Sequence, residues 1–212
     1  MNEKFAICIG REFGSGGLKI AEELAKLLEI NFYDKKLIEL AAQKSGLCEE
    51  YFVKSEDNPA ASVFFGDLSG RSSGIFSAGY YGETPLPNET LFKIQSDIIR
   101  RLSAKESCIF VGRCADYVLR DHPRCLSVFI CDDIDNRVKR IMSAKENESD
   151  FEKVKKEVEK TDKNRAKYYG FYTNKQWGKA VSCHLCMKSS VLGIEGSASY
   201  IRLFAREKFN LK

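Results

Sequence analysis

The sequence predicts an α/β fold in which a parallel sheet is covered by helices on both faces. Short apolar runs alternate with amphipathic stretches along the chain, which is the pattern of βαβ units. The apolar runs are continuous, which indicates strands that are buried on both faces, as in doubly wound sheets. The length of 212 residues fits one domain, 1–212, that carries additional excursions.

The elements follow one another in the order that such a sheet requires. Strands are expected at 5–9, 31–33, 107–111, 126–131 and 181–187, and helices at about 20–28, 37–41, 114–120, 134–145 and 195–207. The first helix is predicted because Ile20, Leu24 and Leu28 recur at helical spacing, with charged residues between them. The third strand is predicted to end at Gly112-Arg113 and the fourth at Asp132-Asp133.

Two segments interrupt this rhythm. Residues 55–88 are rich in Gly, Ser, Phe, Tyr and Pro and have no period, which indicates a functional or partly disordered insertion. Residues 147–169 are charged, but two valines, Asp162 and Arg165 fall on one helical stripe. Two interpretations stay open for the charged pair. It is either an intrahelical ion pair, or part of a helix that swings over a site and presents both charges inward.

The strongest candidate site is the glycine-rich segment Gly10-Arg11-Glu12-Phe13-Gly14-Ser15-Gly16-Gly17, between the first strand and the first helix. Glycines there let backbone N–H groups surround an anion, and the helix N-terminus favours negative charge. The alternative is a tight turn without a ligand. The segment differs from GxxxxGK[ST], since Gly17 stands where the lysine is expected. Arg11 and Lys19 are the nearby cations that can compensate.

Further candidates lie where strands are expected to end, since open parallel sheets bind ligands at their carboxyl edge. Asp34, Arg113 and Asp132 stand there. Capping of the next helix accounts well for Asp132, whereas an arginine beside a buried strand end favours a phosphate. Arg137 and Arg140, one helical turn apart, are equally compatible with a nucleotide and with solvent.

Composition excludes several classes of protein. No apolar run is long enough to span a bilayer and no signal peptide is apparent, so a cytoplasmic protein without membrane contact is expected. A net charge of +4 is too small for a nucleic-acid protein and suits a small anionic substrate. The eight cysteines include a lone pair, Cys183 and Cys186, that lacks a second ligand pair for zinc. Buried reduced thiols are expected instead.

Taken together, these motifs resemble the cytidylate kinase-like family of P-loop phosphotransferases over nearly the whole chain. The resemblance rests on the glycine segment and on Phe32-Tyr33-Asp34-Lys35-Lys36-Leu37-Ile38, Val111-Gly112-Arg113, Asp162-Lys163-Asn164-Arg165-Ala166, Tyr168-Tyr169 and Ser189-Ser190-Val191-Leu192-Gly193-Ile194-Glu195. It implies a P-loop NTPase-type three-layer sandwich with a five-stranded parallel sheet. It also implies that 55–88 is a flexible acceptor-region insertion and 147–169 a lid helix.

The resemblance further implies an ATP-dependent transferase with Mg²⁺, acting on a nucleoside monophosphate such as CMP or dCMP. The resemblance assigns the glycine segment and Arg137 to the donor nucleotide, and Arg113, Asp162 and Arg165 to the acceptor. Together with the candidates above, we expect the catalytic residues to be Arg11, Arg113, Arg165 and Asp162. We expect the donor to bind Gly10, Phe13, Gly14, Ser15, Gly16, Gly17, Lys19 and Arg137, and the acceptor to bind Asp34, Arg113, Asp162 and Arg165. No metal ligand is assigned, and a monomer and a homodimer are both compatible.

The sequence departs from the family's pattern in two places, and each departure suggests an alternative function. The first is a kinase for another small acceptor, because 55–88 does not match the family's CMP-binding segment. The second is a nucleotide-binding protein that lacks kinase activity, because the P-loop lysine and the hydroxyl residue that follows it are both absent.

Overall fold

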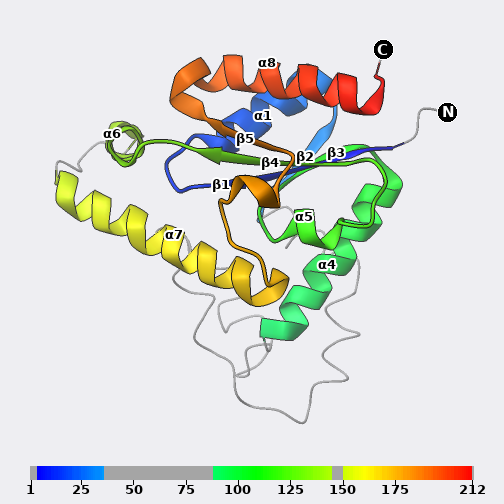
Figure 1. The fold of residues 1–212 in the computed structure, drawn as a ribbon, viewed down its shortest axis with the longest axis horizontal. Helices are drawn as coiled ribbons and strands as arrows, with labels where there is room; N and C mark the ends of the chain where they lie inside the picture. Colours follow the sequence, from blue (N-terminus) through cyan, green and yellow to red (C-terminus); the bar gives the residue numbers. More distant parts are fainter. Residues whose placement is uncertain (1–3, 36–87, 145–149, 212) are drawn as a thin grey trace, which may run out of the picture.

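A five-stranded, all-parallel sheet in the order β2-β3-β1-β4-β5 forms the centre of the molecule (Figure 1). This computed structural model describes residues 4–35, 88–144 and 150–211. The strands are β1 (Ala6–Arg11), β2 (Asn31–Tyr33), β3 (Cys108–Val111), β4 (Cys125–Cys131) and β5 (Leu185–Lys188). Because β3 and β4 flank β1 on opposite sides, the chain reverses its direction of travel at β1, where such sheets bind ligands.

Helices cover both faces of this sheet, which makes three layers. They are α1 (Gly17–Leu28), α4 (Asn88–Lys105), α5 (Ala115–Val118), α6 (Ile134–Ala144), α7 (Phe151–Thr173) and α8 (Ser189–Phe209), with a short 3-10 turn at Ala180–Ser182. In Figure 1, α1 and α8 lie above the sheet, α4 and α5 lie below it, and α7 runs from α6 toward α4.

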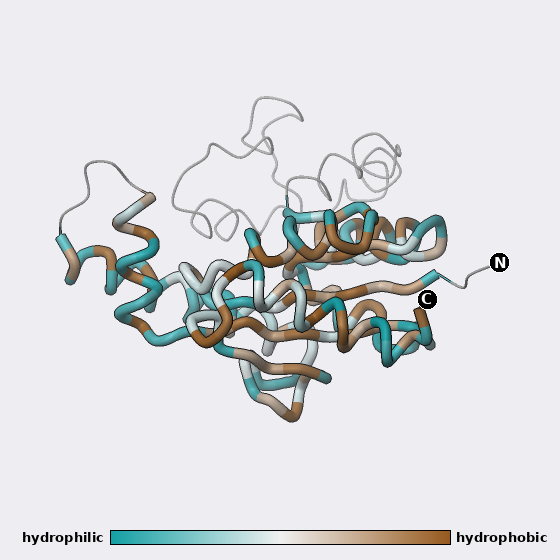
Figure 2. Tube along the Cα trace, turned by 90° about the horizontal axis from the view of Figure 1, so that it is seen from above, coloured by the Kyte–Doolittle hydropathy of each residue, from teal (hydrophilic) through white to brown (hydrophobic). Residues whose placement is uncertain are grey.

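Successive side chains of a buried strand point to opposite faces of the sheet, so each strand contributes to the apolar core on both sides. In β1, Ile7 and Ile9 pack with the apolar residues of α1 and α8, whereas Ala6 and Cys8 pack with those of α4 and α5. Since both sets are buried, the strand is apolar at consecutive positions. Figure 2 shows the hydrophobic segments along the central strands and the inward sides of the helices.

The predicted fold class is confirmed, with corrections to individual elements. The first four strands lie within one or two residues of their expected bounds. The fifth was expected at 181–187 but begins at Leu185, because pairing with β4 starts there and Val181 is 94% exposed in the preceding turn. Helix α4 was not predicted, and α8 begins before its expected start. The expected helix at 37–41 and the 55–88 insertion lie outside the described residues.

No described helix is long and apolar enough to cross a membrane, and no group of three or more described His, Cys, Asp or Glu residues is arranged to hold a metal ion. Cys8 and Cys108 are buried free thiols, as expected, but Cys186 is exposed because β5 is an edge strand.

Candidate active site

The glycine-rich segment forms the connection from β1 to α1, at the carboxyl edge of the sheet. Gly14 and Gly16 have φ values of 78° and 81°, which side chains rarely adopt. They also pack closely: a Cβ on Gly14 would lie 2.8 Å from the Arg137 carbonyl, and one on Gly16 would lie 2.6 Å from Ile194. Glycine is therefore required at both positions to bring the loop against α6 and α8.

The loop turns its carbonyl groups toward α6. The Phe13 carbonyl accepts a hydrogen bond from Arg137 at 3.2 Å, and the Gly14 carbonyl accepts one from Arg140 at 2.5 Å. Among the described residues, no protein partner is recorded for the amides of Gly14, Gly16 and Gly17. Amides at a helix N-terminus without protein partners are available to an anion. The loop is thus compatible with phosphate binding.

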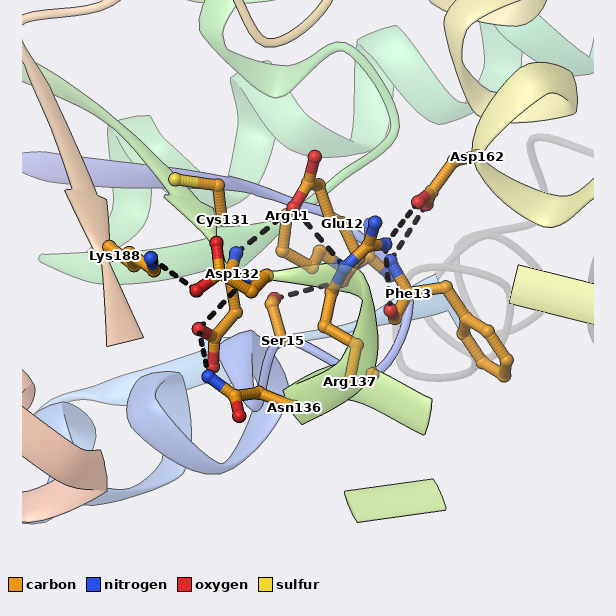
Figure 3. Close-up of polar contacts among 12 residues, drawn as sticks. Arg11, Glu12, Phe13, Ser15, Cys131, Asp132, Asn136, Arg137, Asp162 and Lys188 are labelled. Atoms are coloured by element: carbon orange, nitrogen blue, oxygen red, sulfur yellow. Dashed lines mark hydrogen bonds and ion pairs between the residues drawn. The ribbon is translucent and has the colours of Figure 1, made fainter. Parts of the chain in front are cut away.

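Helix α7 crosses this loop and touches it with two charged side chains. The Phe13 amide donates to a carboxylate oxygen of Asp162 at 2.8 Å, and Arg137 pairs with the other oxygen (Figure 3). Arg165 donates to the Arg11 carbonyl at 3.0 Å and lies over the Phe13 ring. The expectation that both residues face inward is confirmed, and the intrahelical pair is wrong because Asp162 is paired with Arg137.

Arg137 joins the loop to α6 and α7 from a buried position. It is 8% exposed, and its Nε lies 3.5 Å from Glu12. Burial raises the pKa of Glu12, and the backbone amide of Asp132 and the charge of Arg137 oppose this rise. Solvation at the surface, the alternative for Arg137, is therefore wrong. Its assignment to the donor nucleotide stays a prediction.

Asp132 organises the end of β4. Its carboxylate accepts from the Asp133 amide, Asn136, Arg140 and Ser189 at 2.9–3.2 Å (Figure 3 shows part of this set). Burial alone would raise the pKa of Asp132, but hydrogen bonds from Ser190, Arg140 and Asn136 hold that pKa well below its ordinary value. Within the described residues this carboxylate accepts from no backbone amide of α6, so the capping role anticipated for Asp132 is not confirmed. Glu12 and Ser189, which also bind at this end of β4, were not predicted as site residues, although both lie within the motifs quoted above.

The turn after β3 is strained around Arg113. Gly112, Arg113 and Cys114 have φ values of 79°, 58° and 53° in succession. Two non-glycine residues in the left-handed region cost energy, and such strain clusters at functional sites. The Arg113 guanidinium lies 5.9 Å from the centre of the Tyr168 ring on α7. The turn thus brings a third arginine beside Arg11 and Arg165.

Positive charge is in excess where these arginines meet. Burial, together with the charges of Arg165 and Arg113, lowers the pKa of Arg11 to about 9, although Asp34 and Asp162 oppose this. The pKa of Arg165 is lowered in the same way, by burial and by Arg113 and Arg137. Cations that destabilise one another in a partly buried site favour a bound polyanion.

The remaining predicted residues are less closely involved. Lys19 is exposed on α1, and Ser15 is buried with its hydroxyl on the Glu12 carbonyl. Gly10 lies within β1, where a Cβ would be 2.9 Å from the Phe129 ring. Leu18 stands where a P-loop has the hydroxyl residue that binds magnesium. The described loop therefore offers no hydroxyl ligand at that position.

Comparisons with known proteins agree with this geometry. The model of the cytidylate kinase-like family matches residues 6–191. No curated protein matches the chain. A crystal structure of an uncharacterized protein from Eubacterium ventriosum ATCC 27560 is 26% identical, with a TM-score of 0.70, and the match covers 95% of this chain and 98% of that one.

Two kinases share the fold at low identity. The match to shikimate kinase from Bacteroides thetaiotaomicron has 11% identity and a TM-score of 0.52, and it covers 98% of this chain and 99% of the other. The match to a gluconokinase from Sinorhizobium meliloti 1021 has 10% identity and a TM-score of 0.50, and it covers 99% of this chain and 94% of the other.

Proposed function

The chain belongs to the cytidylate kinase-like family, and we propose that it transfers the γ-phosphoryl group of ATP to a nucleoside monophosphate, CMP or dCMP first. The observation that carries this proposal is the convergence of Arg11, Arg113 and Arg165 beside a glycine loop with available amides. Such a site suits two phosphorylated ligands that meet end to end.

In the proposed reaction, an oxygen of the acceptor attacks the γ-phosphorus of ATP. The bond from that phosphorus to the β–γ bridging oxygen breaks, and its electron pair leaves with ADP. A dianionic phosphate acceptor has no proton to lose in this step. The chain's task is therefore to align the two ligands and to offset their charge.

We assign parts of this task to residues. The amides of Gly14, Gly16 and Gly17 hold the β- and γ-phosphates of ATP, and Arg113 and Arg165 hold the acceptor phosphate. Because no hydroxyl residue follows Gly17, magnesium would be held mainly by the phosphates of the nucleotide and by water, and not by the loop. It supplies further charge neutralisation of the phosphates.

Helix α7 is the proposed lid. Its Asp162 carboxylate occupies the Phe13 amide in this structure, and arriving phosphates compete for the same loop. Closure of α7 over bound ligands excludes water and so limits hydrolysis of ATP.

The test is an assay that couples ADP formation to a panel of acceptors: nucleoside monophosphates, shikimate, gluconate and other small hydroxylated acids. We expect turnover with CMP or dCMP. Turnover with a non-nucleotide acceptor indicates a kinase for another metabolite. ATP binding by calorimetry without ADP, even at stoichiometric enzyme, indicates a nucleotide-binding protein.

Substitution of Arg113 tests the acceptor assignment. Arg113→Ala is expected to raise the acceptor KM by about 100-fold, the scale for losing a charge-assisted pair, with a smaller change in the KM for ATP. Arg101→Ala, an exposed arginine of α4, is the matched control. Unchanged kinetics of Arg113→Ala with every acceptor would remove Arg113 from the site.

A further inference from the structure

We infer that Arg11 replaces the P-loop lysine, so that the two ends of the loop have exchanged their roles: the first position carries the cation and the lysine position carries none. This inference rests on the proposed function and names the residue that neutralises the transferring phosphate. Three observations support it: the register of the motif, the space around Gly17 and the position of the Arg11 guanidinium.

The register of the motif shows two matched departures. In GxxxxGK[ST], a glycine is followed five residues later by a second glycine and then by the lysine. If Gly16 is taken as the second glycine, the first glycine position falls on Arg11 and the lysine position on Gly17. The chain therefore has arginine where glycine is expected and glycine where the cation is expected.

The side chain of Arg11 packs directly against Gly17, so the two departures from the motif are linked in space. A Cβ on Gly17 would lie 2.6 Å from the Cβ of Arg11 and 3.0 Å from its Cγ. The stem of Arg11 thus fills the space where a side chain at position 17 would begin. Gly17 starts α1, and its φ lies outside the left-handed region. The backbone alone therefore does not require glycine there, whereas the arginine stem does.

The head of Arg11 reaches the turn after β3. A Cβ on Gly112 would overlap with Nη1 of Arg11. Glycine at 112 thus leaves room for the guanidinium between the loop and the strained turn that carries Arg113. This place lies at the carboxyl ends of the paired strands β1 and β3, where the phosphates are proposed to meet.

The surrounding charges fit this role. Arg165 binds the Arg11 carbonyl, so α7 holds the residue at its backbone and leaves its side chain directed across the site. Lys19, the other cation that the sequence offers as a substitute for the lysine, is exposed on α1. A guanidinium also offers several N–H donors, so it can bind two phosphate oxygens at once, unlike the point charge of lysine.

The decisive experiment returns the standard motif to this chain. Arg11→Gly, Gly17→Lys and the double variant Arg11→Gly/Gly17→Lys are compared with wild type for kcat, KM and ATP affinity by calorimetry. Arg11→Met, which keeps the stem, and Arg101→Met, the exposed control, complete the set. Circular dichroism and thermal melting establish that each variant is folded.

We expect Arg11→Met and Arg11→Gly to lose about 100-fold or more in kcat, the scale for a donor that stabilises transition-state charge. Gly17→Lys is expected to be impaired because its side chain meets the Arg11 stem. The double variant is expected to recover at least about 10-fold over Arg11→Gly, because the lysine enters the space that the arginine vacates. Arg101→Met is expected to match wild type.

The outcomes separate this inference from the proposed function. Wild-type turnover combined with an Arg11→Met kcat within about threefold of wild type overturns the inference and leaves the kinase intact. A double variant no better than Arg11→Gly overturns the exchange of roles. If the wild type binds ATP without turnover, the proposed kinase activity is overturned. In that case, weaker ATP binding by Arg11→Met still supports a contact between Arg11 and the phosphates, and equal ATP binding overturns that contact. A wild type that does not bind ATP overturns both.

Discussion

Single buried carboxylates hold the carboxyl edge of this sheet together, and Asp132 is the clearest example. It accepts hydrogen bonds from Asn136 in the first turn of α6, from Arg140 within that helix and from Ser189 at the start of α8. Arg140 also binds the Gly14 carbonyl. One carboxylate thereby fixes the distance between the glycine loop, α6 and α8, and it stays ionised because so many donors face it.

Asp132→Asn is expected to lower the free energy of unfolding by about 3 kcal/mol at pH 7, because Arg140 loses its buried partner. The folded pKa of Asp132 lies below the unfolded value of about 3.9, so its stabilisation is complete above about pH 5 and is lost as pH falls further. Urea unfolding at pH 7 and pH 3.5 measures this. The difference in the free energy of unfolding between Asp132→Asn and wild type should be smaller at pH 3.5 than at pH 7.

The control for this prediction is the neighbouring carboxylate. Asp133 is 63% exposed at its side chain and pairs with Lys188 at the surface, so Asp133→Asn should change stability far less than Asp132→Asn. The stabilising role of Asp132 would be contradicted if the loss of unfolding free energy in Asp132→Asn did not depend on pH. It would also be contradicted if that loss were no larger than the loss in Asp133→Asn.

Residue-level contacts of this kind were only partly predictable from the sequence. Asp162 and Arg165 were placed on the inward stripe because helical periodicity shows which face a residue occupies. Their partners were not predictable, since Phe13 and Asp162 are 149 positions apart. The reason for glycine at position 17 was hidden as well: it depends on where the stem of Arg11 lies.

At the level of elements, α7 is anchored at both ends and contacts the glycine loop through its middle. Val154 and Val158 pack against α6 in one apolar cluster. Near the other end, Tyr172 stacks on Phe92 of α4 with ring centroids 3.9 Å apart. Asp162 lies between these anchors and supplies the charged contact to the loop.

Asp162→Asn is expected to loosen the middle of α7 in the ligand-free protein, because Arg137 and the Phe13 amide lose a carboxylate partner. Amide hydrogen exchange around residues 158–165 should accelerate by about 10-fold, which corresponds to about 1.4 kcal/mol of local stability. Exchange in α1 and α8 should stay unchanged.

Glu159→Gln is the control for this prediction, since Glu159 is exposed on the same helix. Equal exchange rates in wild type and Asp162→Asn would show that the contact with the loop does not hold α7. Acceleration throughout the molecule would indicate global destabilisation instead.

The elements themselves were largely predictable, and the exceptions have physical causes. The start of β5 was predicted too early because Val181 was counted with the apolar residues of this segment, yet pairing with β4 begins only at Leu185. Helix α4 carried a usable signal that was not used: Leu91, Ile94 and Ile98 recur at helical spacing, and all three are buried against the sheet.

For the whole molecule, the modest net charge of +4 conceals a local concentration of cations. Arg11, Arg113 and Arg165 converge on one edge of the sheet from β1, from the turn after β3 and from α7. There the charge of Arg113 helps to lower the pKa of both Arg11 and Arg165. Their sequence separation means that composition could not reveal this, whereas the continuous apolar strands did reveal the fold. The ligand-free protein therefore carries an electrostatic cost that a bound polyanion removes.

Inorganic tripolyphosphate is accordingly expected to stabilise the wild-type protein in a thermal melt. At about 100 times its dissociation constant, a ligand that binds only the folded state adds about 2.7 kcal/mol, which for a chain of this length raises Tm by about 5–10 °C. Without ligand, Arg11→Met should melt at or above the wild-type temperature, because it removes a cation that burial and two neighbouring arginines destabilise. Its shift with tripolyphosphate should be much smaller than that of wild type, whereas Arg101→Met should keep the full shift. A full shift in Arg11→Met, or none in wild type, would show that these arginines do not form a polyanion site.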